Sequence, residues 1–432
     1  MQARAIAQKS LIILPLLGIA AAMWVDAVID FGFRLPMHDL AIDYGVGMLV
    51  WAALAFTIPL VSQREDLRNV LLVGWGLKGL VALLVMPVYE NLYPLDAIGY
   101  FSAGLSGAPA IADTDLGAGA VLIRGMSKGI QTLIGPSYHG VKVVFGFLGF
   151  LGAWCFYRAF AIVIRRDSTR VLAVAMCTPT VLFWSSILGK DPIVFFGLGL
   201  HTLGVAQLLR IGERRAWITI VAGAALAGIV RPWLLGILIV PLLAVWVLRR
   251  PVTRGFLVVI GAGLVVPRAL RRIQSFTGVP ITRDLLFEGL NRIEGSWAIG
   301  GSAQASGITY SSVADVARFL PRGGFAALFR PLPWERLDPF SVIAGIEGLA
   351  FLCIVAFGVS RTRRAQVADP ALQWTWLLVA AWTAVYAFIS YQNLGTAVRC
   401  RLQIFLPLLA IGFLPLLLPS AASSPPVPPS DA

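Results

Sequence analysis

Long apolar runs, separated by short polar loops, recur along almost the whole chain and constrain the fold more than any other feature. A helix needs about 20 apolar residues to cross a bilayer. Backbone polar groups in lipid must be satisfied within the segment, so such runs fold as transmembrane helices. The sequence therefore predicts an all-α, polytopic transmembrane helical bundle. We place its twelve spans at residues 10–28, 44–61, 70–88, 141–163, 171–188, 192–209, 216–230, 233–248, 256–267, 342–360, 374–390 and 403–418.

The charge content supports this fold class and excludes one function. Only 13% of the 432 residues are charged, whereas soluble domains carry about 25%. The net charge is +13, but the arginines flank apolar runs and form no stripe with exposed aromatic side chains. This pattern argues against nucleic-acid binding and favours membrane lipids as partners. The cysteines have neither disulfide nor zinc spacing and are expected to be small core residues, at Cys155, Cys177, Cys353 and Cys400.

Arginine is concentrated in one set of the short loops, at residues 165–170, 210–215, 249–254 and 361–364. Basic short loops stay in the cytoplasm, so these loops predict the orientation of the bundle, with both termini cytoplasmic. The other set of loops, which holds the unusual polar residues, then faces outward. The segment 1–25 resembles a signal peptide in part, but its apolar character continues to Val25 and favours an uncleaved first span.

We expect residues 1–418 to form a single transmembrane domain with two long outer loops, at 89–140 and 268–341. Each loop contains an amphipathic piece, at Val121–Ile134 and Val313–Leu320. Their helical spacing is typical of helices that lie at the membrane surface, although packing within the loop explains it equally well. The Ser-, Pro- and Ala-rich tail 419–432 reads as a disordered cytoplasmic segment.

Four candidate residues lie in the first half of the predicted outer face. Asp96 could take a proton from an acceptor hydroxyl or hold a divalent metal, or it could cap a helix. Asp191, followed by Pro192, fits the start of a helix, whereas Lys190 could meet a phosphate as a point charge or extend to lipid head groups. His139 is a candidate acid–base group, and the alternative is a polar loop residue.

The second half of the chain contributes mainly arginines. Arg231 interrupts an apolar stretch, and charge at membrane depth is usually functional or paired. A guanidinium offers a planar fork that suits phosphate or carboxylate. Two outer arginines, Arg399 and Arg401, oppose the usual inside-positive bias, so an anionic ligand, lipid or acidic residues must hold them. The remaining candidates for substrate contact are Arg330, Trp334, Glu335 and Asn393, with Trp334 also a natural interfacial anchor.

These residues occur in an order that resembles a known family. The order begins with an outer Asp96 and Tyr100, continues with a Thr178–Ser186 stretch leading to Lys190-Asp191 and with Arg231-Pro232, and ends with Arg399 and Arg401. It looks like that of GT-C-type membrane glycosyltransferases, closest to those encoded with bacterial exopolysaccharide and capsule genes. The resemblance spans roughly residues 90 to 405. It implies a bacterial inner-membrane enzyme that moves a sugar from a polyprenyl-phosphate or polyprenyl-diphosphate carrier to a saccharide or lipid acceptor on the outer, periplasmic side.

Under this resemblance Asp96 becomes the base or a metal-linked group, and Lys190, Arg231, Arg399 and Arg401 become candidates for the carrier phosphate. With the candidates taken from the residues themselves, the catalytic set is Asp96 and His139, and the substrate-binding set is Tyr100, Lys190, Asp191, Arg231, Arg330, Trp334, Glu335, Asn393, Arg399 and Arg401. The chain departs from the family where Ala97 replaces an acidic partner and where Asp96 follows three spans instead of one. A divalent cation, Mg²⁺ or Mn²⁺, is therefore an open question. The alternative functions are an O-antigen-type polymerase or ligase and, in another class, a transporter or flippase of lipid-linked saccharides.

Overall fold

The computed structural model describes residues 21–36, 39–93, 96–105, 117–248, 287–292, 303–304, 307–335 and 338–418. Within these ranges the chain is helical and contains no β-strand, with one isolated bridge between Ala303 and Asn393. The prediction of an all-α fold is confirmed for this part of the chain. The first half of its helices are α2 (Leu40–Ala55), α3 (Ile58–Val61), α4 (Glu65–Leu80), the π-helix η1 (Val81–Val85), α5 (Met86–Leu92), α6 (Ala97–Leu105), α7 (Gly117–Ile134), α8 (Tyr138–Ile164), α9 (Thr169–Cys177) and α10 (Pro179–Trp184).

The second half begins with α11 (Lys190–Arg210), α12 (Ala216–Val230) and α13 (Trp233–Leu248), and continues with α16 (Val313–Phe329), α17 (Pro339–Arg361), α18 (Arg364–Val367), α19 (Pro370–Ser390), α20 (Leu394–Arg401) and α21 (Phe405–Leu417). Six described helices are long and apolar enough to cross a membrane, and the bent α20–α21 pair raises this to seven. The chain is therefore a multi-pass helical membrane protein. The six are Leu40–Val61, Glu65–Leu92, Tyr138–Ile164, Lys190–Arg210, Pro339–Arg361 and Pro370–Ser390.

The count of twelve spans stays a prediction. The predicted spans 216–230 and 233–248 coincide with α12 and α13, which are apolar but shorter than the six long helices. The run 256–267, the first residues of the span 10–28 and the tail 419–432 lie outside the described residues. The predicted span 171–188 is instead two short helices, α9 and α10, because Pro179 begins a new helix after Thr178.

The chain divides into two compact units. Unit 1 comprises Met1–Trp154 and Thr169–Phe196, and unit 2 comprises Cys155–Ser168 and Gly197–Ala432. In unit 1 two indoles join α2 to α4, since Trp51 Nε1 donates to the Trp75 carbonyl at 3.2 Å and Trp75 Nε1 donates back to the Trp51 carbonyl at 3.0 Å. Gly79 makes room for this exchange, because a Cβ there would lie 2.3 Å from Trp51 Nε1.

The turn between α10 and α11 packs against α8 and α4 inside unit 1. A Cβ on Gly149 would be 2.4 Å from the Ser185 carbonyl oxygen, and Gly149 comes eleven residues after Tyr138, the first residue of α8. At 1.5 Å per residue the turn thus lies about 16 Å below that end of α8. Lys78, in α4, donates to the Ser185 hydroxyl. Residues 184–189 are all buried, as irregular backbone at membrane depth must be.

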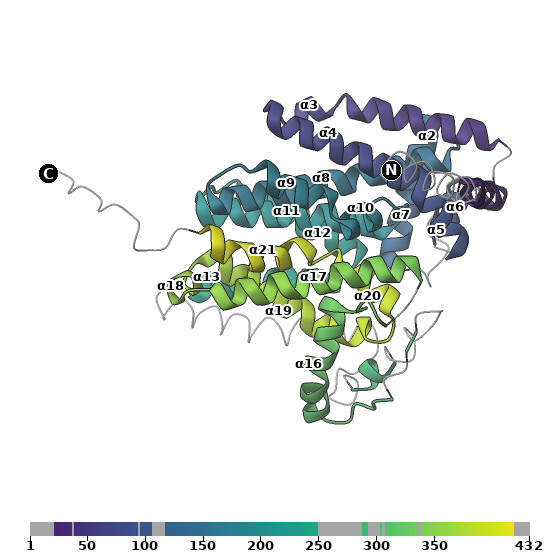
Figure 1. The fold of residues 1–432 in the computed structure, drawn as a ribbon. Helices are drawn as coiled ribbons and strands as arrows, with labels where there is room; N and C mark the ends of the chain where they lie inside the picture. The colour runs from purple at the N-terminus through teal and green to yellow at the C-terminus, as the bar shows by residue number, and fades with distance from the viewer. Residues whose placement is uncertain are drawn as a thin grey trace, which may run out of the picture. The chain divides into compact units, whose positions relative to one another are not determined.

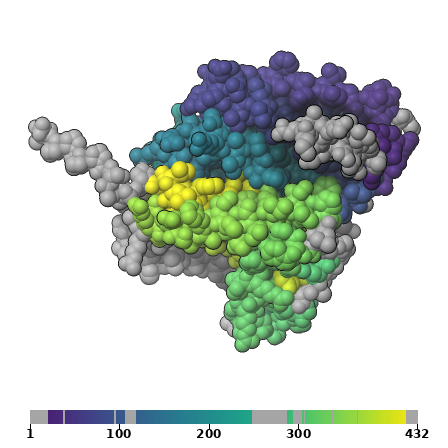
Figure 2. Space-filling view, in the orientation of Figure 1, coloured from purple at the N-terminus to yellow at the C-terminus, as the bar shows by residue number. Residues whose placement is uncertain are grey.

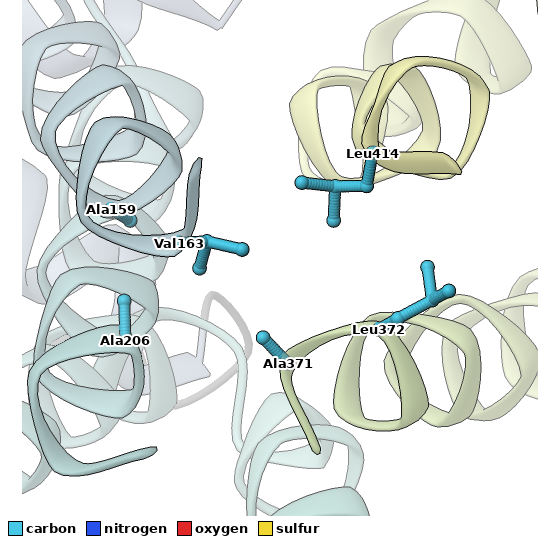
Figure 3. Close-up of a cluster of buried hydrophobic side chains, with 6 residues drawn as sticks. All are labelled: Ala159, Val163, Ala206, Ala371, Leu372 and Leu414. Atoms are coloured by element: carbon cyan, nitrogen blue, oxygen red, sulfur yellow. The ribbon is translucent and has the colours of Figure 1, made fainter. Parts of the chain in front are cut away.

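In unit 2, α21 lies along α17, and α19 runs beside them (Figure 1). The space-filling view shows the yellow residues of α21 directly against the green residues of α17 (Figure 2). The two backbones touch where glycines face each other, since a Cβ on Gly358 would be 2.4 Å from the Gly412 Cα. A buried apolar cluster joins parts of four helices in this unit (Figure 3), and its members are Ala159, Val163, Ala206, Ala371, Leu372 and Leu414.

Both predicted amphipathic pieces are helical, and both pack on a neighbouring helix. The first belongs to α7, which packs against α6, where Gln131 Nε2 donates to the Phe101 carbonyl at 3.1 Å. The second belongs to α16, which packs against α19. Ser312 caps α16, and its hydroxyl donates to Asp315 and holds the pKa of that carboxyl below its usual range. Packing on other helices thus accounts for part of each amphipathic face.

Candidate arginine site around α20

Unit 2 gathers the predicted arginines around the short helix α20. We call Arg231, Arg330, Arg399 and Arg401 the arginine cluster. Arg231 ends α12, at the break before α13, and its Nη1 lies 3.8 Å from the Cys400 sulfur in α20. Its guanidinium also bonds the Tyr386 hydroxyl, which accepts from the indole of the neighbouring α13 at 3.0 Å. Arg399 is half-buried in the last turn of α20.

Arg330 ends α16 and is held by three groups. Its Nε donates to Glu335 at 2.7 Å, and its Nη2 donates to the Gln304 side chain at 3.3 Å. Its guanidinium carbon lies 5.8 Å from the centre of the Tyr391 ring. Glu335 also accepts from the Leu332 backbone N–H at 2.8 Å, which fixes the loop after α16. The structure therefore pairs Arg330 with Glu335 within this loop.

Arg401 is fully buried and turns toward the end of α16. It donates to the carbonyls of Ala327 and Arg330, which are among the orphan acceptors at a helix C-terminus. Glu347, in α17, supplies a nearby negative charge. A C-terminal cation is favourable for the helix dipole as well. These contacts favour a positioning role for Arg401, which fixes the end of α16 and, with it, the position of Arg330.

Buried polar atoms without hydrogen-bond partners are concentrated in the same stretch of chain. Within the described residues they include the Ser390 hydroxyl, both side-chain atoms of Gln392, Arg401 Nη1 and Gln403 Nε2. The four residues are at most 3% exposed. Native proteins leave few such groups unpaired, because each costs about 1–3 kcal/mol. The segment 390–403 therefore has unused hydrogen-bonding capacity that a polar ligand or bound water would satisfy.

Two further predicted residues belong to this region. Asn393 begins α20 as its N-cap, and its side chain accepts from the Thr396 N–H at 3.0 Å, so its side-chain oxygen has a structural role. Trp334 is 68% exposed, which fits the interfacial anchor and leaves its ring open for stacking.

In the same unit an open cleft of about 550 Å³ is lined by Phe287, Glu288, Asn291, Arg292 and Ser311, within the predicted outer loop 268–341.

The cleft connects to the arginine cluster through packed rings. Asn291, in the cleft wall, donates to the Tyr310 carbonyl at 3.0 Å. Tyr310 packs with Phe319 and Phe388, and Phe319 packs on Tyr391, whose ring lies under Arg330. The cleft and the cluster thus belong to one continuous structure.

The other predicted residues belong to unit 1. Asp96 is exposed one residue before α6, and its carbonyl accepts the Tyr100 N–H at 3.0 Å, while the Tyr100 side chain is buried. Asp191 is buried in the first turn of α11, next to the half-buried Lys190. His139 is fully buried in the first turn of α8. A pocket shared by Asp96, Lys190, Arg231 and Arg399 stays a prediction.

Sequence reasoning missed the partners of His139 in unit 1. We call Asp43, Glu90, His139 and Lys142 the buried charge cluster. Asp43 lies at the start of α2 and bonds His139 Nδ1, and Lys142 donates to Glu90 at 3.0 Å. The Tyr138 hydroxyl donates to the other Glu90 oxygen at 2.8 Å. The sequence did contain a signal for these partners, since each of the four residues has a titratable side chain at the edge of an apolar run.

The described residues form no ready-made site for a divalent cation. No group of three or more His, Cys, Asp or Glu side chains among them could hold a metal ion. Asp96, the family's candidate ligand, is exposed and has Ala97 beside it. Mg²⁺ commonly binds through one or two carboxylates together with substrate phosphates, so the divalent cation stays an open question.

The comparisons with known proteins add no assignment. No family model matches the chain, no curated protein matches it, and no solved structure matches it.

Proposed function

We propose that the chain is a membrane glycosyltransferase that binds the phosphate of a polyprenyl-linked sugar at the arginine cluster. The observations that carry the proposal are the contacts of Arg231 with Cys400 and of Arg330 with Tyr391, and the unpaired buried polar atoms of the same stretch 390–403. Within the cluster Glu335 pairs with Arg330, and Glu347 lies near Arg401. Each guanidinium carries a positive charge and a planar fork that suits a phosphate.

The chemistry follows from this charge. The carrier phosphate is the leaving group, and its negative charge grows as the bond from the anomeric carbon to the phosphate oxygen breaks. Fixed guanidinium groups stabilise that developing charge, and they act most strongly where water is excluded. The acceptor saccharide occupies the cleft of Asn291 and Ser311. Its hydroxyl loses a proton to a general base and attacks the anomeric carbon.

The proposal includes an orientation. In the bacterial inner membrane the arginine-rich loops at 165–170, 210–215 and 361–364 face the cytoplasm, as do both termini. Arg231 follows the α12 span that starts after the loop 210–215, so it faces the periplasm. Twelve spans are consistent with this arrangement. A polyprenyl carrier then presents its phosphate at the outer ends of the helices.

A carrier-release assay tests the proposal. The purified protein in nanodiscs is given polyprenyl-phosphate-linked sugars, and the freed carrier is measured by mass spectrometry. We expect Arg231→Ala and Arg399→Ala each to reduce release at least tenfold, because each removes a charge-assisted contact worth about 1.5–3 kcal/mol. Arg64→Ala is the matched control, since Arg64 is exposed and lies in unit 1. Full release by both cluster variants would refute the site.

Two other functions use the same carrier. A polysaccharide polymerase or ligase would share the leaving group, and the chain length of the released product distinguishes it. A transporter of lipid-linked saccharides is favoured by one specific observation, the buried charge cluster within three helices of unit 1, because intramembrane charges often mark transport pathways. Binding of the carrier without any release, together with its movement across vesicles, would support transport.

A further inference from the structure

We propose that the phosphate site of unit 2 takes a diphosphate, so that the donor is a sugar joined to its polyprenyl carrier through two phosphates instead of one. The inference rests on the proposed function, because it names the substrate class of that same site. It starts from Arg322, an arginine of α16 that is not part of the arginine cluster but contacts the same tyrosine ring as Arg330.

The two arginines meet at the ring of Tyr391. The guanidinium carbon of Arg322 lies 5.0 Å from the ring centre, and that of Arg330 lies 5.8 Å from it. The separation of the two guanidinium carbons is therefore at most 10.8 Å, the sum of both distances. One tyrosine thus holds two positive charges within reach of a single elongated anion.

The ring of Tyr391 is held from several sides. It is 5% exposed, and Phe319 packs on it edge to face with 5.2 Å between the ring centres. The side chain of Gln304 ties Arg330 to the same residue, since it accepts from Arg330 Nη2 at 3.3 Å and donates to the Tyr391 carbonyl. The two guanidinium groups therefore contact a ring whose position is fixed.

The two arginines differ in what offsets their charge. Arg330 pairs with Glu335 at 2.7 Å. Arg322 is exposed, and among the residues that the structure describes it meets the Tyr391 ring but no carboxylate and no hydrogen-bond acceptor. A ring contact uses the face of a guanidinium and leaves the N–H donors at its edge for other partners. Arg322 therefore offers an uncompensated charge and a complete set of donors.

The number of phosphates in the carrier decides whether this charge is used. A sugar joined to a polyprenyl tail through one phosphate is a diester with a single negative charge, whereas a diphosphate link carries one charge on each phosphorus. Planar guanidinium forks suit phosphate oxygens. With a diphosphate, Arg330 binds one phosphate and Arg322 binds the other. A single phosphate leaves Arg322 without a partner.

The residues on either side of Tyr391 supply a second observation. Ser390 is fully buried and Gln392 is 1% exposed. The Ser390 hydroxyl and both polar side-chain atoms of Gln392 have no hydrogen-bond partner among the described residues. A hydroxyl and an amide N–H are donors that phosphate oxygens accept, and a diphosphate offers more of these oxygens than a single phosphate does.

Binding of two matched carriers tests the inference. The probes are the methyl esters of polyprenyl phosphate and polyprenyl diphosphate, which share the tail, lack any sugar and carry one and two negative charges. Affinities are measured by microscale thermophoresis on the full-length protein in phosphatidylcholine nanodiscs, which contain no anionic lipid. We expect the diphosphate ester to bind about fivefold more tightly, the upper end of what an exposed ion pair contributes. Equal affinities would overturn the inference and leave the phosphate site itself in place.

Two variants of α16 separate Arg322 from general charge attraction. Arg322→Gln should bind both esters alike and keep the wild-type affinity for the monophosphate ester. Arg318→Gln is the matched control, because Arg318 is exposed one turn earlier and contacts no ring among the described residues, so this variant should keep the fivefold preference. A preference that survives Arg322→Gln, or is lost in Arg318→Gln, refutes the role of Arg322. Wild-type affinity for both esters in Arg231→Ala would refute the proposed phosphate site, and the inference with it.

A measurement on the unchanged protein identifies the residue directly. Phenylglyoxal modifies accessible guanidinium groups, and peptide mass spectrometry follows each arginine separately. At saturating concentrations the diphosphate ester should protect Arg322 from modification, the monophosphate ester should not, and neither should protect Arg318. An Arg322 that is modified at the same rate with either ester refutes the diphosphate site.

Discussion

Removing one partner of the Glu90–Lys142 pair should destabilise the protein far more than removing both. The two side chains are 2% and 0% exposed, and their charged atoms lie 3.0 Å apart. Lys142→Met leaves the Glu90 charge with the Tyr138 hydroxyl as its remaining hydrogen-bond partner among the described residues. An uncompensated buried charge costs about 3–5 kcal/mol. The loss of the Lys142 contact with the Tyr138 ring, 4.9 Å away, acts in the same direction.

The double variant Glu90→Gln/Lys142→Met should recover most of this loss, because no isolated charge remains. We expect its free energy of unfolding to lie within about 1–2 kcal/mol of the wild-type value, which gives a large coupling energy. The assay is reversible unfolding in mixed micelles, followed by tryptophan fluorescence. The control is Arg64→Met, which breaks an exposed pair with Asp66 and should cost less than about 1 kcal/mol.

Two results would refute this reasoning. A Lys142→Met variant that unfolds with the same free energy as the Arg64→Met control would show that the pair is not a buried charge pair. A double variant whose loss equals the sum of the single losses would show that Glu90 and Lys142 do not compensate each other.

The remaining predictions concern packing. Gly149→Ala should lower the free energy of unfolding by about 1–3 kcal/mol, since its Cβ would meet Ser185. The control Gly146→Ala should be nearly neutral, because its Cβ would lie 3.9 Å from the nearest atom, the Ser186 Cα. Equal melting temperatures of the two variants would contradict this prediction. Leu372→Ala, in the cluster of Figure 3, should cost about 2–5 kcal/mol in the same unfolding assay, and a loss below 1 kcal/mol would refute full burial. Arg401→Lys should destabilise α16, seen as faster amide exchange in that helix, and unchanged exchange would exclude the positioning role.

The helices were largely predictable from the sequence, because apolar runs of sufficient length have few other solutions. The predicted spans 141–163, 192–209 and 374–390 coincide closely with α8, α11 and α19. The helix expected over 171–188 is interrupted, because Pro179 begins a second short helix there. The depth of the following turn was hidden as well, since it depends on the contact of Ser185 with Gly149, a pair distant in sequence.

The candidate site was predictable only in part. Arg231, Arg330 and Arg401 stand out in the sequence, and the structure joins them around α20. The role of each arginine was not visible in the sequence. Arg401, for example, donates hydrogen bonds to the carbonyls at the end of α16. Asp43 was overlooked for a related reason, since a carboxylate at the start of an apolar run reads as an ordinary helix cap. Its bond to His139 links positions 96 residues apart.

The buried turn between α10 and α11 has a consequence for how the protein enters the membrane. Together α9 and α10 measure about 22 Å along their axes, which is shorter than the apolar layer of about 30 Å. Alone in lipid, the segment from α9 to α11 would expose the polar backbone of residues 185–189 to hydrocarbon. Stable insertion of the α9–α11 segment therefore requires α4 and α8 to be in place first, and synthesis from the N-terminus delivers them in that order. A ribosome-bound chain that lacks α4 should release the α9–α11 segment from the membrane.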